Sequence, residues 1–290
     1  MERGGPANQS GILYQNSIAA LYLGRLCDST PRPDEHAVEG VRVEAPTAVD
    51  DIVVTYRDGH RTFIQAKENV RDNDSAWQEI WNSFKRQFWQ LDFQKGKDRL
   101  LLQVGEVHNE HHAVREMAIR ASSSLNHAEW ISRFTEDQKK LLKKITALFD
   151  PKHAAAEEEI LSFFKHSDLE IRPLIDIERD LVPYWIPQSN KTQIELFKLL
   201  RDAVGGAARR RDSFSMTSLS SRLAAESNVT FAVQPGLDEL LETVRGCGAG
   251  LKQHKQSFGN TGIHLKRAVV EVIKTWILEP SDRPECWNTT

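Results

Sequence analysis

The sequence predicts an α/β fold, in which a core with the order αβββαβ forms a mixed sheet and a mostly α-helical C-terminal region follows. The first observation is a helical spacing of apolar residues over 11–27. The second is a series of three short apolar runs between residues 38 and 67, separated by turn residues. The third is a return to helical spacing over 75–92, followed by an apolar run at 100–104. This order of a helix, three strands, a helix and a further strand predicts one sheet covered by helices.

The first element is a helix from about Gly11 to Cys27, because residues such as Ile18, Leu21 and Tyr22 recur at helical intervals. The polar, proline-containing stretch 28–34 ends this helix and forms a loop. The helix therefore has one apolar face available for packing on the sheet.

Three strands follow, at about 38–46, 50–57 and 61–67. The stretch Arg57-Asp58-Gly59-His60 joins the last two as a hairpin turn. Side chains alternate between the two faces of a strand, so Gln65 and Lys67 are expected to point the same way.

The segment 75–92 is a helix for which Asp74-Ser75 is a suitable N-terminal cap. Its tryptophans and phenylalanines fall mostly on one face, and packing in a core explains them better than base stacking. Residues 97–107 read as a further strand, buried on both faces at 100–104, and a helix over 110–123 covers the sheet.

From residue 126 to 167 the pattern is helical, with Pro151 between two helices. Residues 169–175 form a late strand at the edge of the sheet, where Pro173 is tolerated. Pro183, Pro187 and Ser189-Asn190 mark the best boundary. The predicted domains are 1–185, with its core at about 11–125, and a helical domain over 190–290.

The second domain is predicted to contain short helices and to serve oligomerisation or partner binding. One helix covers 192–204 and ends at Gly205-Gly206, and Ser215 begins another. Two more are expected at 236–244 and 264–278.

The composition is that of a soluble globular protein. The 290 residues include 38 Lys and Arg against 41 Asp and Glu, for a net charge of −3. This balance argues against a DNA coat protein held by charge alone. No apolar run is long enough to cross a bilayer, the N-terminus lacks a signal-peptide pattern, and the three cysteines are far apart. We therefore expect a cytoplasmic protein without a disulfide framework.

The candidate chemistry lies in the hairpin. If its strands pair, Asp51 lies near Gln65 and Lys67, so that a carboxylate, a carbonyl oxygen and an ammonium group converge. Such oxygen ligands suit a hard cation, Mg²⁺ or Mn²⁺. A lysine beside the cation can stabilise negative charge on a phosphate or orient a water. These three residues are the predicted catalytic set for phosphodiester hydrolysis.

Other residues are predicted to support this set. Asp50 is an alternative to Asp51 if a bulge exchanges their faces. Glu44, at the end of the preceding strand, is either a further metal ligand or an ordinary surface charge. Gln15 lies on the first helix and supplies an amide, which adds no negative charge.

The chain resembles the PD-(D/E)xK nuclease superfamily in its Gln-x-Lys variant, and more specifically the Cap4-type nuclease domain, also called DUF4297. The resemblance covers about the first 125 residues and, more weakly, the stretch to about residue 185. It rests on four segments in this order, Gly11–Gln15, Val41–Glu44, Asp50–Val54 and Phe63–Lys67. It implies a restriction-endonuclease-like core in the domain 1–185. In related nucleases a glutamate often occupies the position of Gln15, and this departure implies either weak metal binding or a site that assembles only when DNA binds.

The resemblance also implies the activity, a metal-dependent endonuclease that cuts double-stranded DNA as the effector of an anti-phage defence system. Such an enzyme must be restrained, so we expect a homo-oligomer, an NTPase partner such as a HerA-type helicase or a STAND NTPase, or both. The chain itself carries no P-loop motif. Two alternatives stay open. One is a catalytically silent nuclease-like module that binds DNA or protein, and the other is an adaptor whose helical half is the functional part.

Several basic residues are candidates for contact with DNA phosphates. They are Lys85, Arg86, Arg209, Arg210 and Arg211. The first two are equally consistent with a solvated surface, and a solvated loop is the default interpretation of the last three. The run His108-Asn109-Glu110-His111-His112 is better explained as a polar helix start than as a metal site, since no second ligand set with zinc spacing accompanies it.

Overall fold

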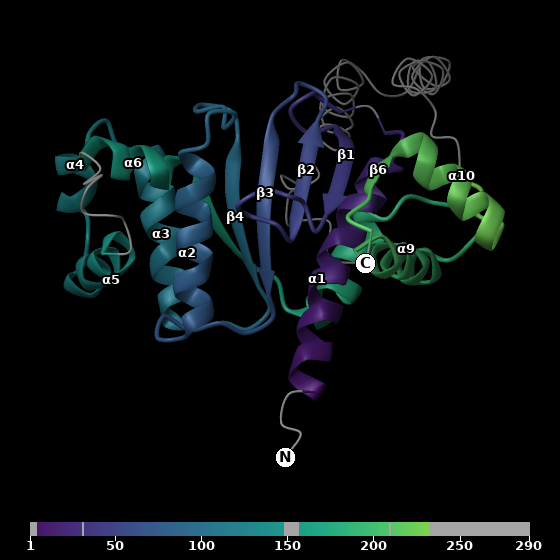
Figure 1. Cartoon of the computed structure of the whole chain (residues 1–290), viewed down its shortest axis with the longest axis horizontal. Coiled ribbons are helices and arrows are strands. Elements are labelled where there is room, and N and C mark those ends of the chain that lie inside the picture. The colour runs from purple at the N-terminus through teal and green to yellow at the C-terminus, as the bar shows by residue number, and fades with distance from the viewer. Residues whose placement is uncertain (1–4, 31, 148–156, 209, 232–290) are drawn as a thin grey trace, which may run out of the picture.

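The computed structural model describes residues 5–30, 32–147, 157–208 and 210–231. Figure 1 shows a central sheet with α2 and α3 on one side and α1, α9 and α10 on the other. The sheet has six strands in the order β5-β4-β3-β2-β1-β6. The mixed α/β class predicted from the sequence is confirmed.

The strands alternate in direction on one side of β3 and run parallel on the other. β1, β2 and β3 pair antiparallel, β4 and β5 pair parallel to β3 and to each other, and β6 pairs antiparallel with β1. The strands are β1 (Val38–Val43), β2 (Ile52–Tyr56), β3 (Arg61–Lys67), β4 (Arg99–Val104), β5 (Ser167–Ile171) and β6 (Ser213–Ser215). The antiparallel part places the two strands of the predicted hairpin in the middle of the sheet.

The order α1-β1-β2-β3-α2-β4 is the predicted αβββαβ order. Later helices complete the layers. The helices are α1 (Gly5–Leu26), α2 (Ser75–Phe88), α3 (Asn109–Ser122), α4 (His127–Ser132), α5 (Glu136–Thr146), α6 (Glu157–Lys165), α7 (Leu174–Asp176), α8 (Val182–Trp185), α9 (Gln193–Ala208) and α10 (Met216–Ser227), with a π-helical turn at Ile177–Leu181 between α7 and α8.

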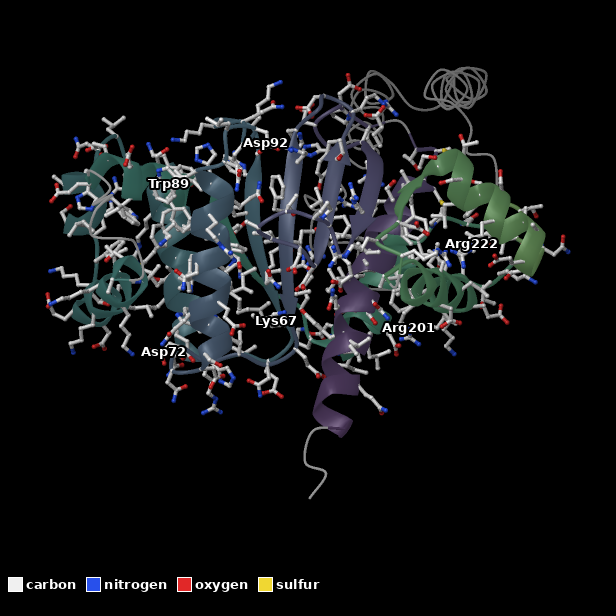
Figure 2. The ribbon with its side chains drawn as sticks, viewed as in Figure 1. Lys67, Asp72, Trp89, Asp92, Arg201 and Arg222 are labelled. Carbon is white, nitrogen blue, oxygen red and sulfur yellow. The ribbon has the colours of Figure 1, made fainter. Side chains whose placement is uncertain are left out.

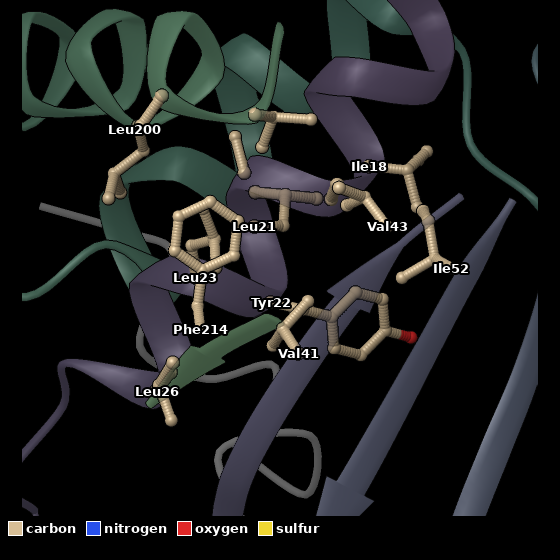
Figure 3. Packing of buried hydrophobic residues seen from close by; sticks show 14 of the residues in the cluster. Ile18, Leu21, Tyr22, Leu23, Leu26, Val41, Val43, Ile52, Leu200 and Phe214 are labelled. Atoms are coloured by element: carbon tan, nitrogen blue, oxygen red, sulfur yellow. The ribbon is translucent and has the colours of Figure 1, made fainter. Parts of the chain in front are cut away.

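The sheet separates two apolar cores, because side chains alternate along each strand. On β3, Ile64 belongs to the core under α1, whereas Phe63 belongs to the core under α2. Figure 3 shows the first core, where Tyr22 and Leu21 of α1 pack near Val41 of β1. The second core contains the aromatic side of α2, whose Trp81 is almost completely buried. The core interpretation of these aromatics is confirmed.

Most elements lie where the sequence predicts them. The turn before β3 contains Gly59 at φ +83°, a conformation that favours glycine. β5 forms the edge of the sheet, as expected for the late strand, but it ends at Ile171, and Pro173 caps α7 instead of lying in the strand. Ser215 caps α10 by accepting a hydrogen bond from the backbone N–H of Ser218.

Several helix ends differ from the prediction. α1 begins at Gly5 rather than near Gly11, and α2 ends at Phe88 rather than near residue 92. The helix expected over 192–204 continues through Gly205 and Gly206 to Ala208. Val204 and Ala207 of this helix, α9, are buried in the same core as α1. Burial of this face outweighs the weak helix propensity of two glycines, each of which costs about 1 kcal/mol.

The chain after the predicted boundary at residue 190 adds to the sheet. β6 pairs with β1, and α9 shares the apolar core under α1. The helices expected at 236–244 and 264–278, and Pro151, lie outside the described residues. None of the described helices is both long and apolar enough to cross a membrane.

Candidate active site

The structure brings the three predicted catalytic side chains together. Asp51 directly precedes β2, and Gln65 and Lys67 end β3. The Nζ atom of Lys67 lies 3.3 Å from Oδ2 of Asp51. All three residues line a pocket of about 710 Å³. Figure 2 labels Lys67 at the end of β3, in the middle of the molecule.

Strand pairing explains this convergence. The register Ile52↔Ile64 sets Asp51 opposite the end of β3. Val53 and Phe63 belong to the α2-side core, and the alternation of faces puts Asp51 and Gln65 on this same side. A hydrogen bond from the backbone N–H of Ala66 to Oδ2 of Asp51, 2.9 Å long, then fixes the carboxylate.

The pocket combines burial with charge. Asp51 and Gln65 are each only 6% exposed. Burial raises the pKa of the Asp51 carboxyl above its ordinary value, and the neighbouring Lys67 ammonium and the Ala66 N–H partly offset this rise. The carboxylate is thus desolvated and held by two donors at one oxygen, a state typical of functional sites.

The supporting residues divide between two hollows. Asp50 is exposed and lines the pocket with Asp51. Gln15 lines a second hollow of about 570 Å³, which shares Lys67 with the first. Its Nε2 donates to Oε1 of Glu44 at 3.1 Å. Glu44 has φ +48° and does not belong to the lining of the first pocket. The amide of Gln15 therefore already occupies one Glu44 oxygen.

The basic residues that were predicted to contact DNA lie in two different places. Lys85 and Arg86 of α2 line the pocket that holds Lys67. Arg210 and Arg211 lie in the connection from α9 to β6, on the far side of β1 from β2, and Arg210 pairs with Asp212 at 2.8 Å. Arg209 lies outside the described residues. The structure thus brings Lys85 and Arg86 to the pocket, whereas Arg210 and Arg211 lie next to β6 at one edge of the sheet.

Three polar residues of the pocket were not anticipated, Glu79, Asn82 and Ser83 of α2. Together with Arg86 they recur at intervals of three and four, between the buried positions of the helix. The polar side of an amphipathic helix was therefore the signal that points to them. The loop before β2 is tied to this helix, since the N–H of Ala48 donates to Oε1 of the buried Gln87.

The oxygen donors of the pocket fit a hard cation only in part. Asp51, Asp50 and the carbonyl oxygen of Gln65 are ligands that Mg²⁺ prefers. Among the residues that the structure describes, however, no three His, Cys, Asp or Glu side chains gather as a metal site. A cation here would need water or substrate oxygens as further ligands, as Mg²⁺ commonly does.

The histidine run has a structural role. His108 is the N-terminal cap of α3, and His111 is fully buried, with its Nε2 2.9 Å from the carbonyl oxygen of Val70. This confirms the polar helix start predicted for this stretch.

Comparison with known proteins gives weak similarities only. No protein-family model matches the chain, and no curated protein matches it. A solved Acinetobacter baumannii structure described as a Cap4 SAVED/CARF-domain containing receptor with the cyclic trinucleotide 3'3'3'-cAAA is similar at a TM-score of 0.44 and 10% identity, over 73% of this chain and 44% of that one. A Moraxella osloensis Cap4 receptor of the same description is similar at a TM-score of 0.42 and 14% identity, over 76% of this chain and 48% of that one.

The chain thus spans less than half the length of these solved chains. Their TM-scores are too low to establish a shared fold. The restriction-endonuclease-like core accordingly stays a prediction from the sequence.

Proposed function

We propose that the protein is a metal-dependent endonuclease that hydrolyses phosphodiester bonds of double-stranded DNA at the pocket of Asp51, Gln65 and Lys67. The observation that supports this most is the 3.3 Å approach of Lys67 Nζ to a carboxylate that is 6% exposed, on the wall of an open pocket. Exposed ion pairs stabilise a protein by only about 0–1 kcal/mol. Stability alone therefore does not explain a strand-end lysine held beside a buried carboxylate.

Each residue has a distinct task. Lys67 places a positive charge where negative charge develops on the phosphate, and a fixed charge of this kind needs no reorganisation during the reaction. Asp51 and the Gln65 carbonyl oxygen, with Asp50, would hold Mg²⁺ or Mn²⁺. When bound, such an ion lowers the pKa of a water and polarises the phosphate. The hydrogen bond from Ala66 N–H keeps the Asp51 carboxylate in position.

The wall formed by α2 is proposed to receive the DNA backbone. Lys85 and Arg86 lie on the same pocket as Lys67, at a helix whose other face is buried. Cationic side chains beside the reacting phosphate position the duplex without reading its sequence. The net charge of −3 makes this local placement necessary for binding.

The proposal extends to the setting of the enzyme. The segments Gly11–Gln15 and Phe63–Lys67, which resemble the Cap4-type nuclease domain, favour a role as the effector of an anti-phage system. A homo-oligomer and an NTPase partner, of the HerA or STAND type, would restrain such an effector in its host.

A second candidate is a nuclease-like module that binds DNA or protein without cutting. The scarcity of carboxylates favours it, since among the described residues no set of three acidic, histidine or cysteine side chains forms a metal site. In this case Lys67 and Asp51 would serve as a binding pair.

The deciding experiment is plasmid cleavage by the full chain, by Lys67→Ala and by Lys198→Ala, in Mg²⁺, Mn²⁺ and EDTA. Lys198 is an exposed lysine on α9 and serves as the matched control. We expect cleavage that requires the metal, survives in Lys198→Ala and is lost in Lys67→Ala. Undiminished cutting by Lys67→Ala would refute the assignment. DNA binding without cleavage in every condition would favour the second candidate.

A further inference from the structure

The pocket of the proposed active site contains a carboxylate to which the proposed reaction gives no task. This is Glu79 of α2, which lines the pocket together with Asp51, Gln65 and Lys67. Its side chain is exposed, and it makes no hydrogen bond or ion pair with any residue that the structure describes. An exposed glutamate is common on a helix, but this one adds negative charge to a pocket that should receive a phosphate.

The polar side of α2 is divided by charge. Its pocket-lining residues Glu79, Asn82, Ser83 and Arg86 follow one another at intervals of three and four, so they form one line along the helix. The first and the last of them are separated by about 10 Å along the helix axis, at a rise of about 1.5 Å per residue. The line therefore has an acidic end and a basic end, with two neutral side chains between them.

The acidic end of this line lies toward the end of β3. Figure 2 labels Asp72, just before α2, on the level of Lys67, and Trp89, just after α2, at the other end of the helix. Glu79 belongs to the second turn of α2, and Arg86 to its last turn. Glu79 is therefore the nearer of the two to the level of Lys67.

A second observation indicates a ligand at this end of the pocket. Gln65 is only 6% exposed, and its carboxamide has no hydrogen-bond partner among the described residues. It lines the pocket from the side of the sheet. Since buried polar groups normally have a partner, this amide is available to a group that enters the pocket. Its oxygen can accept a hydrogen bond from water or bind a hard cation.

The charges at the acidic end favour a cation over a phosphate. Asp50 and Glu79 both line the pocket, and neither side chain has a hydrogen bond or an ion pair within the described part of the chain. The charge of Lys67 is already balanced by Asp51, 3.3 Å away. This end of the pocket therefore carries excess negative charge, which attracts a divalent cation and repels a DNA phosphate.

Glu79 can act on such a cation without touching it. Among the described residues, no three acidic, histidine or cysteine side chains gather closely enough to form a metal site. Mg²⁺ keeps several of its waters when a protein binds it, and a carboxylate can hold the ion by accepting hydrogen bonds from them. The place of Glu79, on the α2 wall of the pocket, suits this indirect role.

We propose that Glu79 makes DNA binding depend on the cation, because it holds the hydrated ion through water and repels the DNA backbone while the ion is absent. This inference rests on the proposed function, since it concerns the same pocket. Glu79 acts through water, so it is a positioning residue. By linkage, an ion that strengthens DNA binding is itself bound more tightly when DNA is present.

Two binding measurements on the full chain test this inference without any cleavage. Calorimetry with Mn²⁺ alone gives the dissociation constant of the ion, and fluorescence anisotropy of a labelled DNA duplex in EDTA gives that of DNA without metal. The variants are Glu79→Gln, which removes the charge, and Glu79→Asp, which keeps it. Glu159→Gln is the matched control, because Glu159 is exposed on α6 and does not line the pocket.

We expect Glu79→Gln to raise the dissociation constant of Mn²⁺ by roughly 10-fold. The same variant should bind DNA in EDTA roughly fivefold more tightly, because one repelling charge is lost. Glu79→Asp and Glu159→Gln should stay close to the wild type in both measurements. A residue that only stabilised the helix would not shift the two affinities in opposite directions.

The inference is overturned if either affinity of Glu79→Gln equals that of the wild type, if Glu159→Gln shows the same shifts, or if the wild type binds neither Mn²⁺ nor DNA. The plasmid experiment above separates it from the proposed function. Opposite shifts of the two affinities without plasmid cleavage would support the inference and count against the nuclease. Cleavage that depends on Lys67, together with unchanged affinities of Glu79→Gln, would overturn the inference alone.

Discussion

The two faces of the sheet differ in whether their buried polar atoms have hydrogen-bond partners. On the α2 face, the buried Asp51 carboxylate has donors from Ala66 and Lys67, and it borders an open pocket. On the α1 face, Arg25 and Gln103 leave buried atoms without partners. The first arrangement has its hydrogen-bond donors within the chain and faces a pocket. The second leaves polar atoms without a partner from the chain, and each such atom carries a desolvation cost.

The largest effect should come from removing a buried charge whose partners are complete. Asp98 is fully buried and accepts from the N–H and the side chain of Arg61 and from the N–H of Gln94. We expect Asp98→Ala to lower the free energy of unfolding by about 3–5 kcal/mol, because donors are left unpaired. Chemical denaturation measures this. A loss below that of Arg25→Met would break the contrast between partnered and unpartnered groups.

The next largest effect is expected for Lys67→Ala, and it concerns activity. If Lys67 stabilises charge at the phosphate, cleavage should fall by roughly 100-fold or more. Lys67 is one-third exposed but its partner Asp51 is buried, so removing Lys67 should also lower the free energy of unfolding, by roughly 1–3 kcal/mol. Single-turnover cleavage and a thermal melt of the same sample check both parts. A large loss of stability with unchanged cleavage would make the lysine structural.

A smaller effect is expected at Gly24, where α1 passes close to α8. A Cβ atom at this position would lie 2.5 Å from Cδ1 of Ile186 and 3.0 Å from the carbonyl oxygen of Trp185. Gly24→Ala should cost about 1–3 kcal/mol by overpacking. Gly11→Ala is the matched control, since nothing lies within 4 Å of its added Cβ. Equal melting temperatures for the two variants would contradict this close contact.

The smallest effect concerns Asp51→Asn. Folding raises the pKa of the Asp51 carboxyl above its unfolded value, which is near 3.9. The free energy of unfolding is therefore lowered by the ionised carboxylate at pH values above the folded-state pKa. This loss of stability is absent at pH values below the unfolded pKa. The neutral amide should therefore be more stable than wild type at pH 7, by roughly 1 kcal/mol. The difference should shrink as pH falls through the folded pKa. Melting curves from pH 7 to pH 4 test the sign, and a growing difference would contradict it.

Much of the candidate site was predictable from the sequence. Alternation of faces placed Gln65 with Lys67, and hairpin pairing brought Asp51 to them, both of which are short-range rules. Glu79 was missed because the polar side of α2 reads as an ordinary solvated face. The end of α9 was wrong because Gly205 and Gly206 favour a stop, whereas packing of Val204 against the α1 core continues the helix.

Local patterns along the chain were thus sufficient for the order of elements from α1 to β4 and for the three catalytic candidates, because those features depend on neighbours in the sequence. The folded structure alone decided which face of α2 lines the pocket and which side chains meet under α1. Gln103 meets Glu170 and Tyr22 across 67 and 81 positions of sequence. No periodicity encodes contacts at such separations, since they arise only when the parallel strands β4 and β5 are covered by α1.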